Sequence, residues 1–168
     1  MSDAPFVIRA AVLTVSDRCA AGEAVDASGP RVEATLRERL GAAVLERAIV
    51  PDGIEPVEGM LRLWCDLRAG LHLVAVTGGT GFSPRDLTPE AAMRVIERPA
   101  PNLMELARAR CGAAHPKAYL SRAVAGVAGR TLIVTLPGSP AGAAEMLEAI
   151  ADVLPHAVRL ATGDRAGH

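Results

Sequence analysis

The stretch LHLVAVTGGTGFSPRDLTPE, residues 71–90, contains the pattern that decides the fold. Its first seven residues form an apolar run rich in valine and leucine, which predicts a strand over 71–77 that is buried on both faces. A glycine loop follows directly, and Thr88 and Pro89 then resemble the cap and the first position of a helix. A buried strand, a polar loop and a helix in this order are typical of an α/β domain.

The same alternation recurs on both sides of this stretch. Apolar β-branched runs predict strands over 6–16, 43–50 and 131–136, with a glycine turn joining the last of these to a short β segment before it. Apolar residues at helical spacing predict helices from Ser28 to Gly41, from Pro56 to Gly70, over 88–97, over 103–112, and after Ser139 and Pro155. We therefore expect residues 1–168 to form one α/β domain around a mostly parallel sheet.

Composition supports a compact globule and excludes several classes of protein. Half of the 168 residues are hydrophobic and 22% are charged, so the chain has enough core material to fold without a disulfide or a structural metal. The formal net charge is −1, and no run of like charges stands out. Nucleic acid is therefore not an expected partner, because its backbone favours a clustered basic surface.

The cysteines and the hydropathy pattern bear on the cellular compartment. The three cysteines form no C-x-x-C pair, which favours reduced thiols over a disulfide framework or a zinc site. No apolar stretch approaches the ~20 residues of a membrane span, and no export segment is recognisable. We expect a cytoplasmic protein without a membrane partner.

Unusual polar segments follow the predicted strands. Ser16 and Asp17 follow the first strand and Asp52 follows the second, while the glycine loop and the segment LPGSP at 136–140 follow the later two. In open α/β sheets, ligands bind beyond the carboxyl ends of the strands. These segments are therefore expected to converge on one ligand site.

The glycine loop consists of Thr77, Gly78, Gly79, Thr80 and Gly81. Its small residues permit close approach of a ligand, and successive backbone amides can bind an anion such as a phosphate; a tight structural turn explains the same residues equally well. The loop matches neither common nucleotide-binding motif and has no lysine beside it. A bound triphosphate would then need Arg85, helix N-termini or a divalent cation as its counter-charge.

Two aspartates and a serine have both a chemical and a structural interpretation. Asp52 and Asp86, at separate strand ends, are suitable ligands for Mg²⁺, although an aspartate can also simply cap a turn. Ser139, with Gly138 before it and Pro140 after it, is a helix N-cap that can also face a second anion. Ser16 and Asp17 are open to the same two interpretations.

Other reactive side chains are assigned structural roles. His72 falls inside a predicted strand, and His115 and His156 follow no metal-ligand spacing. Cys19 has no obvious activating base, and Trp64 lies on the apolar face of a predicted helix. None of these residues is expected to carry the chemistry.

Six segments stand in order along nearly the whole chain: VSDR at 15–18, DASGPR at 26–31, VPD at 50–52, TGGTGFSPRDLTPEA at 77–91, LSRAVAG at 120–126 and LPGSP at 136–140. Together they resemble the molybdopterin adenylyltransferase family of molybdenum cofactor biosynthesis. The resemblance implies a three-layer α/β/α sandwich, a homotrimer, and an enzyme that uses Mg-ATP to adenylylate molybdopterin with release of pyrophosphate. The product would pass to a molybdenum insertase.

Site residues follow from the same resemblance. It places Asp52 and Asp86 at the metal and catalytic positions. Residues 77–81, Ser121 and Ser139 fall on the molybdopterin side, and Ser16, Asp17, Gly138 and Pro140 on the nucleotide side. At Gly53 the chain differs from the many family members that carry an acidic residue after the Pro-Asp pair.

Two other functions are compatible with the resemblance. The first is a molybdopterin-binding carrier, or partner of an insertase, that does not turn ATP over. The second is a stand-alone domain of an insertase. The retained Asp52 and Asp86 count against the carrier, and the lack of additional domains counts against the insertase.

Overall fold

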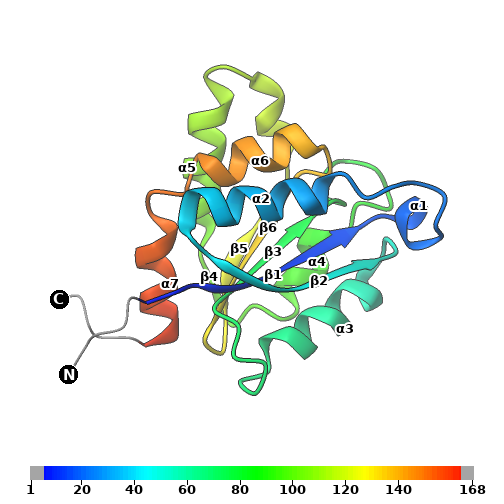
Figure 1. Cartoon of the computed structure of the whole chain (residues 1–168). Coiled ribbons are helices and arrows are strands. Elements are labelled where there is room, and N and C mark those ends of the chain that lie inside the picture. Colours follow the sequence, from blue (N-terminus) through cyan, green and yellow to red (C-terminus); the bar gives the residue numbers. More distant parts are fainter. Residues whose placement is uncertain (1–5, 164–168) are drawn as a thin grey trace, which may run out of the picture.

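A mostly parallel sheet forms the centre of the molecule. In the computed structural model, which describes residues 6–163, the sheet has six strands in the order β2-β1-β3-β6-β5-β4 (Figure 1). Their bounds are β1 (Arg9–Val15), β2 (Ala43–Val50), β3 (Leu73–Thr77), β4 (Arg98–Pro99), β5 (Ala125–Ala128) and β6 (Thr131–Leu136). The pairs β1–β2, β1–β3 and β3–β6 are parallel, whereas β5 runs antiparallel to both β6 and β4. The expected mostly parallel sheet is confirmed.

Helices cover both faces of this sheet. They are α1 (Asp17–Ala20), α2 (Ser28–Leu40), α3 (Ile54–Cys65), α4 (Thr88–Met93), α5 (Pro101–Gly112), the 3₁₀ helix η1 (Pro116–Leu120), α6 (Pro140–Glu148) and α7 (Leu154–Thr162). Buried residues of α2, α5, α6 and α7 form one apolar core on one face, and those of α3 and α4 form a second core on the other (Figure 1). The fold is the expected three-layer α/β/α sandwich.

Alternation along the strands supplies both cores. In β1, Ala10 and Val12 face the α2 side, whereas Ala11 and Leu13 face the α3 side, and all four are completely buried. A strand with both faces covered has no need of polar residues, which explains why the central strands read as continuous apolar runs. Trp64 lies in the second core, as expected.

The helix after β2 differs from the prediction at both ends. It begins at Ile54, before Pro56, and it ends at Cys65 rather than at Gly70. Asp66 adopts an extended conformation, and its side chain accepts a hydrogen bond from the amide of Arg68 (2.8 Å), a local turn that competes with further helix. Leu67, which the helix predicted up to Gly70 would have included, is consequently 69% exposed.

The region after the glycine loop also differs. Helix α4 ends at Met93, because Val95 and Ile96 turn inward to bury their side chains before β4. Leu87, not Thr88, is its N-cap; the amide of Thr88 donates to Gly79 O (3.1 Å), which draws Thr88 under the glycine loop. His72 lies just before β3 rather than inside it, and its Nδ1 accepts a hydrogen bond from the amide of Arg9.

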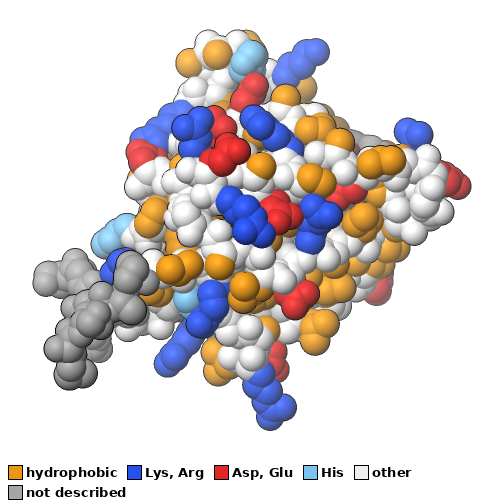
Figure 2. All heavy atoms as spheres, viewed as in Figure 1, with side chains coloured by type: hydrophobic (Ala, Val, Ile, Leu, Met, Phe, Trp, Pro, Cys, Tyr) orange, Lys and Arg blue, Asp and Glu red, His pale blue; other side chains and the backbone are white. Residues whose placement is uncertain are grey.

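The face of the molecule over α2 and α6 carries both signs of charge. Figure 2 shows basic and acidic side chains side by side there. Arg37 and Arg47 both pair with Glu33, and Arg39 pairs with Glu148. This face therefore presents paired charges rather than a basic patch. Within residues 6–163, no helix combines the length and the apolar character that crossing a membrane would require. Residues 1–5 and 164–168 of the expected domain lie outside the described part of the chain.

Candidate active site

Four parallel strands bring the polar segments to one edge of the sheet. Val15 pairs with Val50, Thr14 pairs with Thr77, and Thr77 pairs with Leu136. The residues that follow these strand ends must therefore emerge close to one another. Two cavities open at this edge, where the sequence predicted that the polar segments converge on one ligand site.

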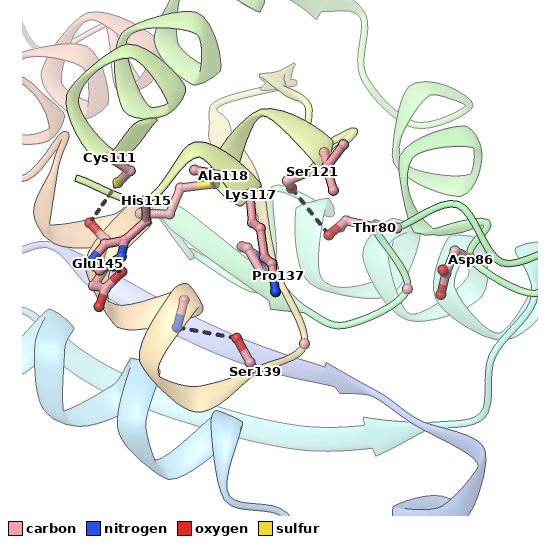
Figure 3. A pocket seen from close by; sticks show the side chains of 16 residues that line it. Thr80, Asp86, Cys111, His115, Lys117, Ala118, Ser121, Pro137, Ser139 and Glu145 are labelled. Atoms are coloured by element: carbon pink, nitrogen blue, oxygen red, sulfur yellow. Dashed lines mark hydrogen bonds and ion pairs between the residues drawn. The ribbon is translucent and has the colours of Figure 1, made fainter. Parts of the chain in front are cut away.

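The larger cavity has a volume of about 520 Å³. One wall comes from the glycine loop and its surroundings: Gly79, Thr80, Gly81, Asp86 and Ser121. A second wall is the start of α6 with the segment before it: Pro137, Gly138, Ser139, Gly142, Glu145 and Met146. A third comes from α5 and η1: Cys111, His115, Lys117, Ala118 and Leu120. Figure 3 shows Thr80 and Asp86 at one end of this cavity and Cys111, His115 and Glu145 at the other.

The smaller cavity, of about 300 Å³, lies on the β1 and β2 side. Its lining is Thr14, Val15, Ser16, Cys19, Val25, Asp26, Ala27, Ser28, Asp52, Gly78, Gly79, Gly138 and Pro140. Gly79 and Gly138 line both cavities. The two spaces thus meet at residues that have no side chain to separate them.

The glycine loop can adopt its path only because Gly78 and Gly79 have no side chain. Gly78 has φ +108°, and a Cβ there would lie 2.2 Å from the carbonyl oxygen of Val15. Gly79 has φ +63°, and a Cβ there would lie 2.4 Å from Thr88 Oγ1 and 3.5 Å from Asp52 Oδ1. Both positions therefore exclude other residues on conformation and on space. The loop brings its backbone next to Asp52 and to the end of β1.

The amino end of α6 contributes an electropositive wall. Ser139 is the N-cap of this helix, and its Oγ accepts a hydrogen bond from the amide of Gly142 (3.2 Å). The positive end of the helix dipole consequently faces the larger cavity, where Lys117, the chain's only lysine, stands in the facing wall. Together they bring positive charge to these two walls, where an anionic group can bind, while Asp86 and Glu145 bring negative charge to the same cavity.

Asp52 is held by backbone contacts on the β1 side. Its Oδ2 accepts the amide of Asp17 (2.9 Å), while its own amide donates to Asp17 Oδ1 (3.0 Å). Arg85 forms an ion pair with the other oxygen of Asp17. Arg85 is thus already engaged by a carboxylate, so its role as counter-charge for a triphosphate would require it to exchange partners.

Gly53, which the resemblance singles out because an acidic residue is expected after the Pro-Asp pair, adopts φ +126° as the N-cap of α3. An L residue rarely adopts this conformation, so an acidic side chain would strain the turn that follows Asp52. The glycine is therefore required by the backbone as it is built here.

The predicted site residues divide between the two cavities. Of the molybdopterin set, Gly79, Thr80, Gly81, Ser121 and Ser139 line the larger cavity. Thr77 is fully buried, with its hydroxyl donating to Pro137 O (2.7 Å), and Gly78 lines the smaller cavity. Of the nucleotide set, Ser16, Gly138 and Pro140 line the smaller cavity, and Asp17 stands behind it through its contact with Asp52. Asp52 and Asp86 line different cavities.

Several residues of the site were not identified from the sequence. His115 was given no role, yet it lines the larger cavity 3.9 Å from Glu145. Cys111 lies beside them, and burial together with the charge of Glu145 raises the pKa of its thiol. Asp26 lines the smaller cavity and accepts the hydroxyl of Thr14 (2.8 Å) and the amide of Gly29 (2.9 Å). Asp26 opens the DASGPR segment that carries part of the resemblance, which was the available signal for it. No spacing pattern marked His115 or Cys111, because α5 and η1 meet the sheet edge only in the fold.

A glycine loop and two joined cavities lie at the carboxyl edge of the central sheet in a three-layer α/β/α sandwich, and together they define a ligand-binding α/β domain. Residues 11–156 match the model of the family described as "Probable molybdopterin binding domain". The chain belongs to this family.

Relatives extend the family assignment. The chain is 37% identical to a molybdopterin adenylyltransferase of Helicobacter pylori, covering 94% of this chain and 89% of that protein. It is 39% identical to the molybdenum cofactor synthesis protein cinnamon of Drosophila melanogaster, covering 91% of this chain but only 25% of that longer protein. Among solved structures, the molybdopterin biosynthesis enzyme MoaB of Thermus thermophilus superposes with a TM-score of 0.87 at 46% identity, covering 94% and 98% of the two chains.

Proposed function

We propose that this protein is a molybdopterin adenylyltransferase, which transfers the adenylyl group of ATP to molybdopterin and releases pyrophosphate. The observation that carries the proposal is the pair of cavities that meet at Gly79 and Gly138. Group transfer between two substrates requires that their reacting atoms approach closely while each substrate keeps its own binding surface. Two adjoining cavities with only glycine between them satisfy this requirement.

The larger cavity is proposed to hold molybdopterin. Gly79, Thr80 and Gly81 of the glycine loop line it together with Ser121 and Ser139, while Thr77 is buried behind this wall and Gly78 lines the smaller cavity. The α6 dipole and Lys117 supply positive charge for the terminal phosphate of the pterin. At 520 Å³ the cavity is within the usual range for a small-molecule site.

The smaller cavity is proposed to hold the nucleotide, with Ser16, Asp17, Gly138 and Pro140 on that side. Asp52 and Asp86 are proposed as the catalytic carboxylates, because they stand on opposite sides of the Gly79–Gly138 junction. The reaction needs no covalent intermediate on the protein. An oxygen of the pterin phosphate attacks the α-phosphorus of ATP, the bond to the β-phosphate breaks, and pyrophosphate leaves.

The carboxylates at the two cavities fit a Mg²⁺ ion that is bound mainly by the phosphate groups of the substrates. No group of three or more His, Cys, Asp or Glu side chains within residues 6–163 could hold a metal by itself. Asp52 Oδ2 is occupied by the amide of Asp17, and its Oδ1 is directed to the space at Gly79. One or two carboxylates completed by phosphate oxygens and waters are the usual ligands of Mg²⁺. We propose Asp52 and Asp86 as its protein ligands, and the ion would supply charge stabilisation at the phosphates.

The remaining features are proposed from the family. We propose a homotrimer located in the cytoplasm, with a molybdenum insertase as the partner that consumes the product. The match to 25% of the longer molybdenum cofactor synthesis protein cinnamon supports a role in the synthesis of this cofactor. Sedimentation at micromolar concentration tests the trimer, and a species of only 17.4 kDa would contradict it.

The deciding experiment incubates the purified protein with molybdopterin and ATP, with Mg²⁺ or with excess EDTA, and detects the adenylylated pterin by mass spectrometry. We expect product and pyrophosphate in equal amounts with Mg²⁺, and no product with EDTA. Stoichiometric pterin binding without product under both conditions would instead establish the carrier function. Full turnover in EDTA would disprove the metal assignment alone.

A further inference from the structure

Arg122 lies behind the glycine-loop wall of the larger cavity and contacts it at several points. Its backbone amide donates to Thr80 O (2.8 Å). Its side chain donates from Nε to Gly81 O (2.8 Å) and from Nη2 to Asp86 O (2.5 Å). The remaining guanidinium nitrogen, Nη1, pairs with Glu90 Oε1 in α4 (2.5 Å). A single residue thus joins the glycine loop, Asp86 and the helix that follows.

The neighbours of Arg122 show how this arrangement relates to the cavity. Ser121, directly before it, lines the cavity, and its hydroxyl lies 3.3 Å from that of Thr80 (Figure 3). Gly81 and Asp86 line the cavity as well, whereas Arg122 contacts them through their backbone carbonyls. These two carbonyl oxygens are consequently not free to turn toward an anion in the cavity.

The segment between Gly81 and Asp86 has little else to fix it. Residues 82–85 are exposed, and Phe82 is 69% exposed. Within the segment, the amide of Ser83 donates to Asp86 Oδ2 and the amide of Asp86 donates to Ser83 O, both at 2.9 Å. The ion pair of Arg85 with Asp17 joins two solvent-accessible side chains, and such pairs contribute little to stability. The conformation of this loop therefore depends on Arg122.

An arginine suits this role and a lysine does not. A guanidinium presents five N–H donors in one plane, so it can reach two carbonyls and a carboxylate together, whereas an ammonium is a single point of charge. Glu90 balances the charge that Arg122 brings. The hydrogen bond from Arg122 lowers the pKa of the Glu90 carboxyl, so this partner remains ionised at neutral pH.

We propose that Arg122 is a positioning residue, which holds the loop 81–86 by the carbonyls of Gly81 and Asp86 and so keeps the Asp86 carboxylate at the cavity wall. The loop-holding part of this proposal is independent of the activity. Its catalytic consequence rests on the proposed function, in which Asp86 is a catalytic carboxylate.

Hydrogen exchange tests the loop-holding part without any substrate. In Arg122→Lys we expect the amides of Ser83 and Asp86 to exchange about tenfold faster or more, because charge-assisted hydrogen bonds to two carbonyls are lost. The matched control is Arg110→Lys, because Arg110 also binds one carbonyl (Ala149 O) and one carboxylate (Asp152), both at 2.7 Å, away from this loop. The control should leave exchange of the loop amides unchanged.

A double-mutant cycle tests the catalytic consequence. We expect Arg122→Lys to lower the single-turnover rate of adenylylation by about tenfold with a smaller change in molybdopterin affinity. In an Asp86→Asn background the same substitution should have almost no further effect on rate, because it acts through Asp86. A merely structural role would lower the melting temperature and give additive effects on rate.

Hydrogen exchange, the double-mutant cycle and the wild-type activity each test a different part of the proposal. The proposal is overturned if the amides of Ser83 and Asp86 exchange at the wild-type rate in both the Arg122→Lys and the Glu90→Gln protein, whatever the activity of these variants. Faster exchange with additive effects on rate would overturn its catalytic part. If the wild-type protein makes no adenylylated pterin, the proposed function fails, and hydrogen exchange still decides whether Arg122 holds the loop.

Discussion

Asp17 and Asp52 each accept a hydrogen bond from the backbone amide of the other, at 2.9 and 3.0 Å. This reciprocal pair joins the segment after β1 to the segment after β2 and places Asp17 directly behind Asp52, which lines the smaller cavity. Each carboxylate keeps one oxygen for another partner: Asp17 binds Arg85, and Asp52 Oδ1 is directed to the space at Gly79.

The pair predicts different outcomes for two substitutions at Asp17. Asp17→Asn retains an oxygen for the amide of Asp52 and loses only the exposed ion pair with Arg85, so the free energy of unfolding should change by less than about 1 kcal/mol. Asp17→Ala leaves the Asp52 amide without its partner and should cost about 1–3 kcal/mol. Urea denaturation of the three proteins measures the difference. Equal stability of the two variants would show that the hydrogen bond from the Asp52 amide to the Asp17 side chain contributes nothing.

Asp86→Asn should separate chemistry from folding. The asparagine oxygen can still accept the amide of Ser83, so the loop and the melting temperature should be preserved. Adenylylation should nevertheless fall by about 10²-fold or more, on the order of 3 kcal/mol of transition-state stabilisation, because the negative charge is lost. Single-turnover kinetics and pterin titration provide the measurement. An active Asp86→Asn protein would remove Asp86 from the catalytic assignment.

Gly79→Ala should displace the glycine loop at the junction between the cavities. The new Cβ would meet Thr88 Oγ1, a buried hydroxyl with no hydrogen-bond partner in the described part of the chain. We expect both substrates to bind about tenfold more weakly or worse, because the loop must shift away from Thr88 and Asp52. Isothermal titration with molybdopterin and with ATP measures this.

Gly22→Ala is the matched control for that substitution. Gly22 has φ +74°, close to the +63° of Gly79, but a Cβ there would have nothing within 4 Å. It should carry the same backbone strain, of roughly 1–2 kcal/mol, without affecting substrate binding. If both variants bind substrates equally well, the close approach at Gly79 has no function.

The pairing of Glu90 with Arg122 predicts a pH dependence of stability. Because the hydrogen bond from Arg122 lowers the pKa of Glu90 below its ordinary value of 4.5, the folded state is favoured at pH values above 4.5. This contribution should disappear as the pH falls from there through the lowered pKa. Urea unfolding between pH 3 and about 7 should show a shallower acid limb for Glu90→Gln than for Glu38→Gln, an exposed control on α2. Identical acid limbs would contradict the prediction.

The sequence by itself determined the layers of the fold. Continuous apolar runs predicted the central strands, because a strand covered on both faces by helices has no polar side, and β1, β3 and β6 lie where these runs stand. The strand predicted over 43–50 is β2, at the edge of the sheet, where Leu45, Glu46 and Arg47 are exposed. The sequence also predicted the edge at which the site lies, since polar segments directly after parallel strands must meet there. The sequence pattern did not predict every helix end. The turn at Asp66 ends α3 before Gly70, because its side chain offers the backbone a hydrogen bond that competes with further helix.

Only the tertiary structure decided how the site is divided and which further residues line it. The sequence grouped Asp52 with Asp86, but the fold places them on opposite sides of Gly79 and Gly138. His115 and Lys117 became cavity residues because η1 packs against α5 and lies across the cavity from the start of α6, and Arg122 came to hold the loop 81–86 from 36 residues away. Periodicity and motif spacing report what a residue does within its own segment. Contacts between distant segments depend on how the layers pack, and this is the information that the sequence pattern alone does not contain.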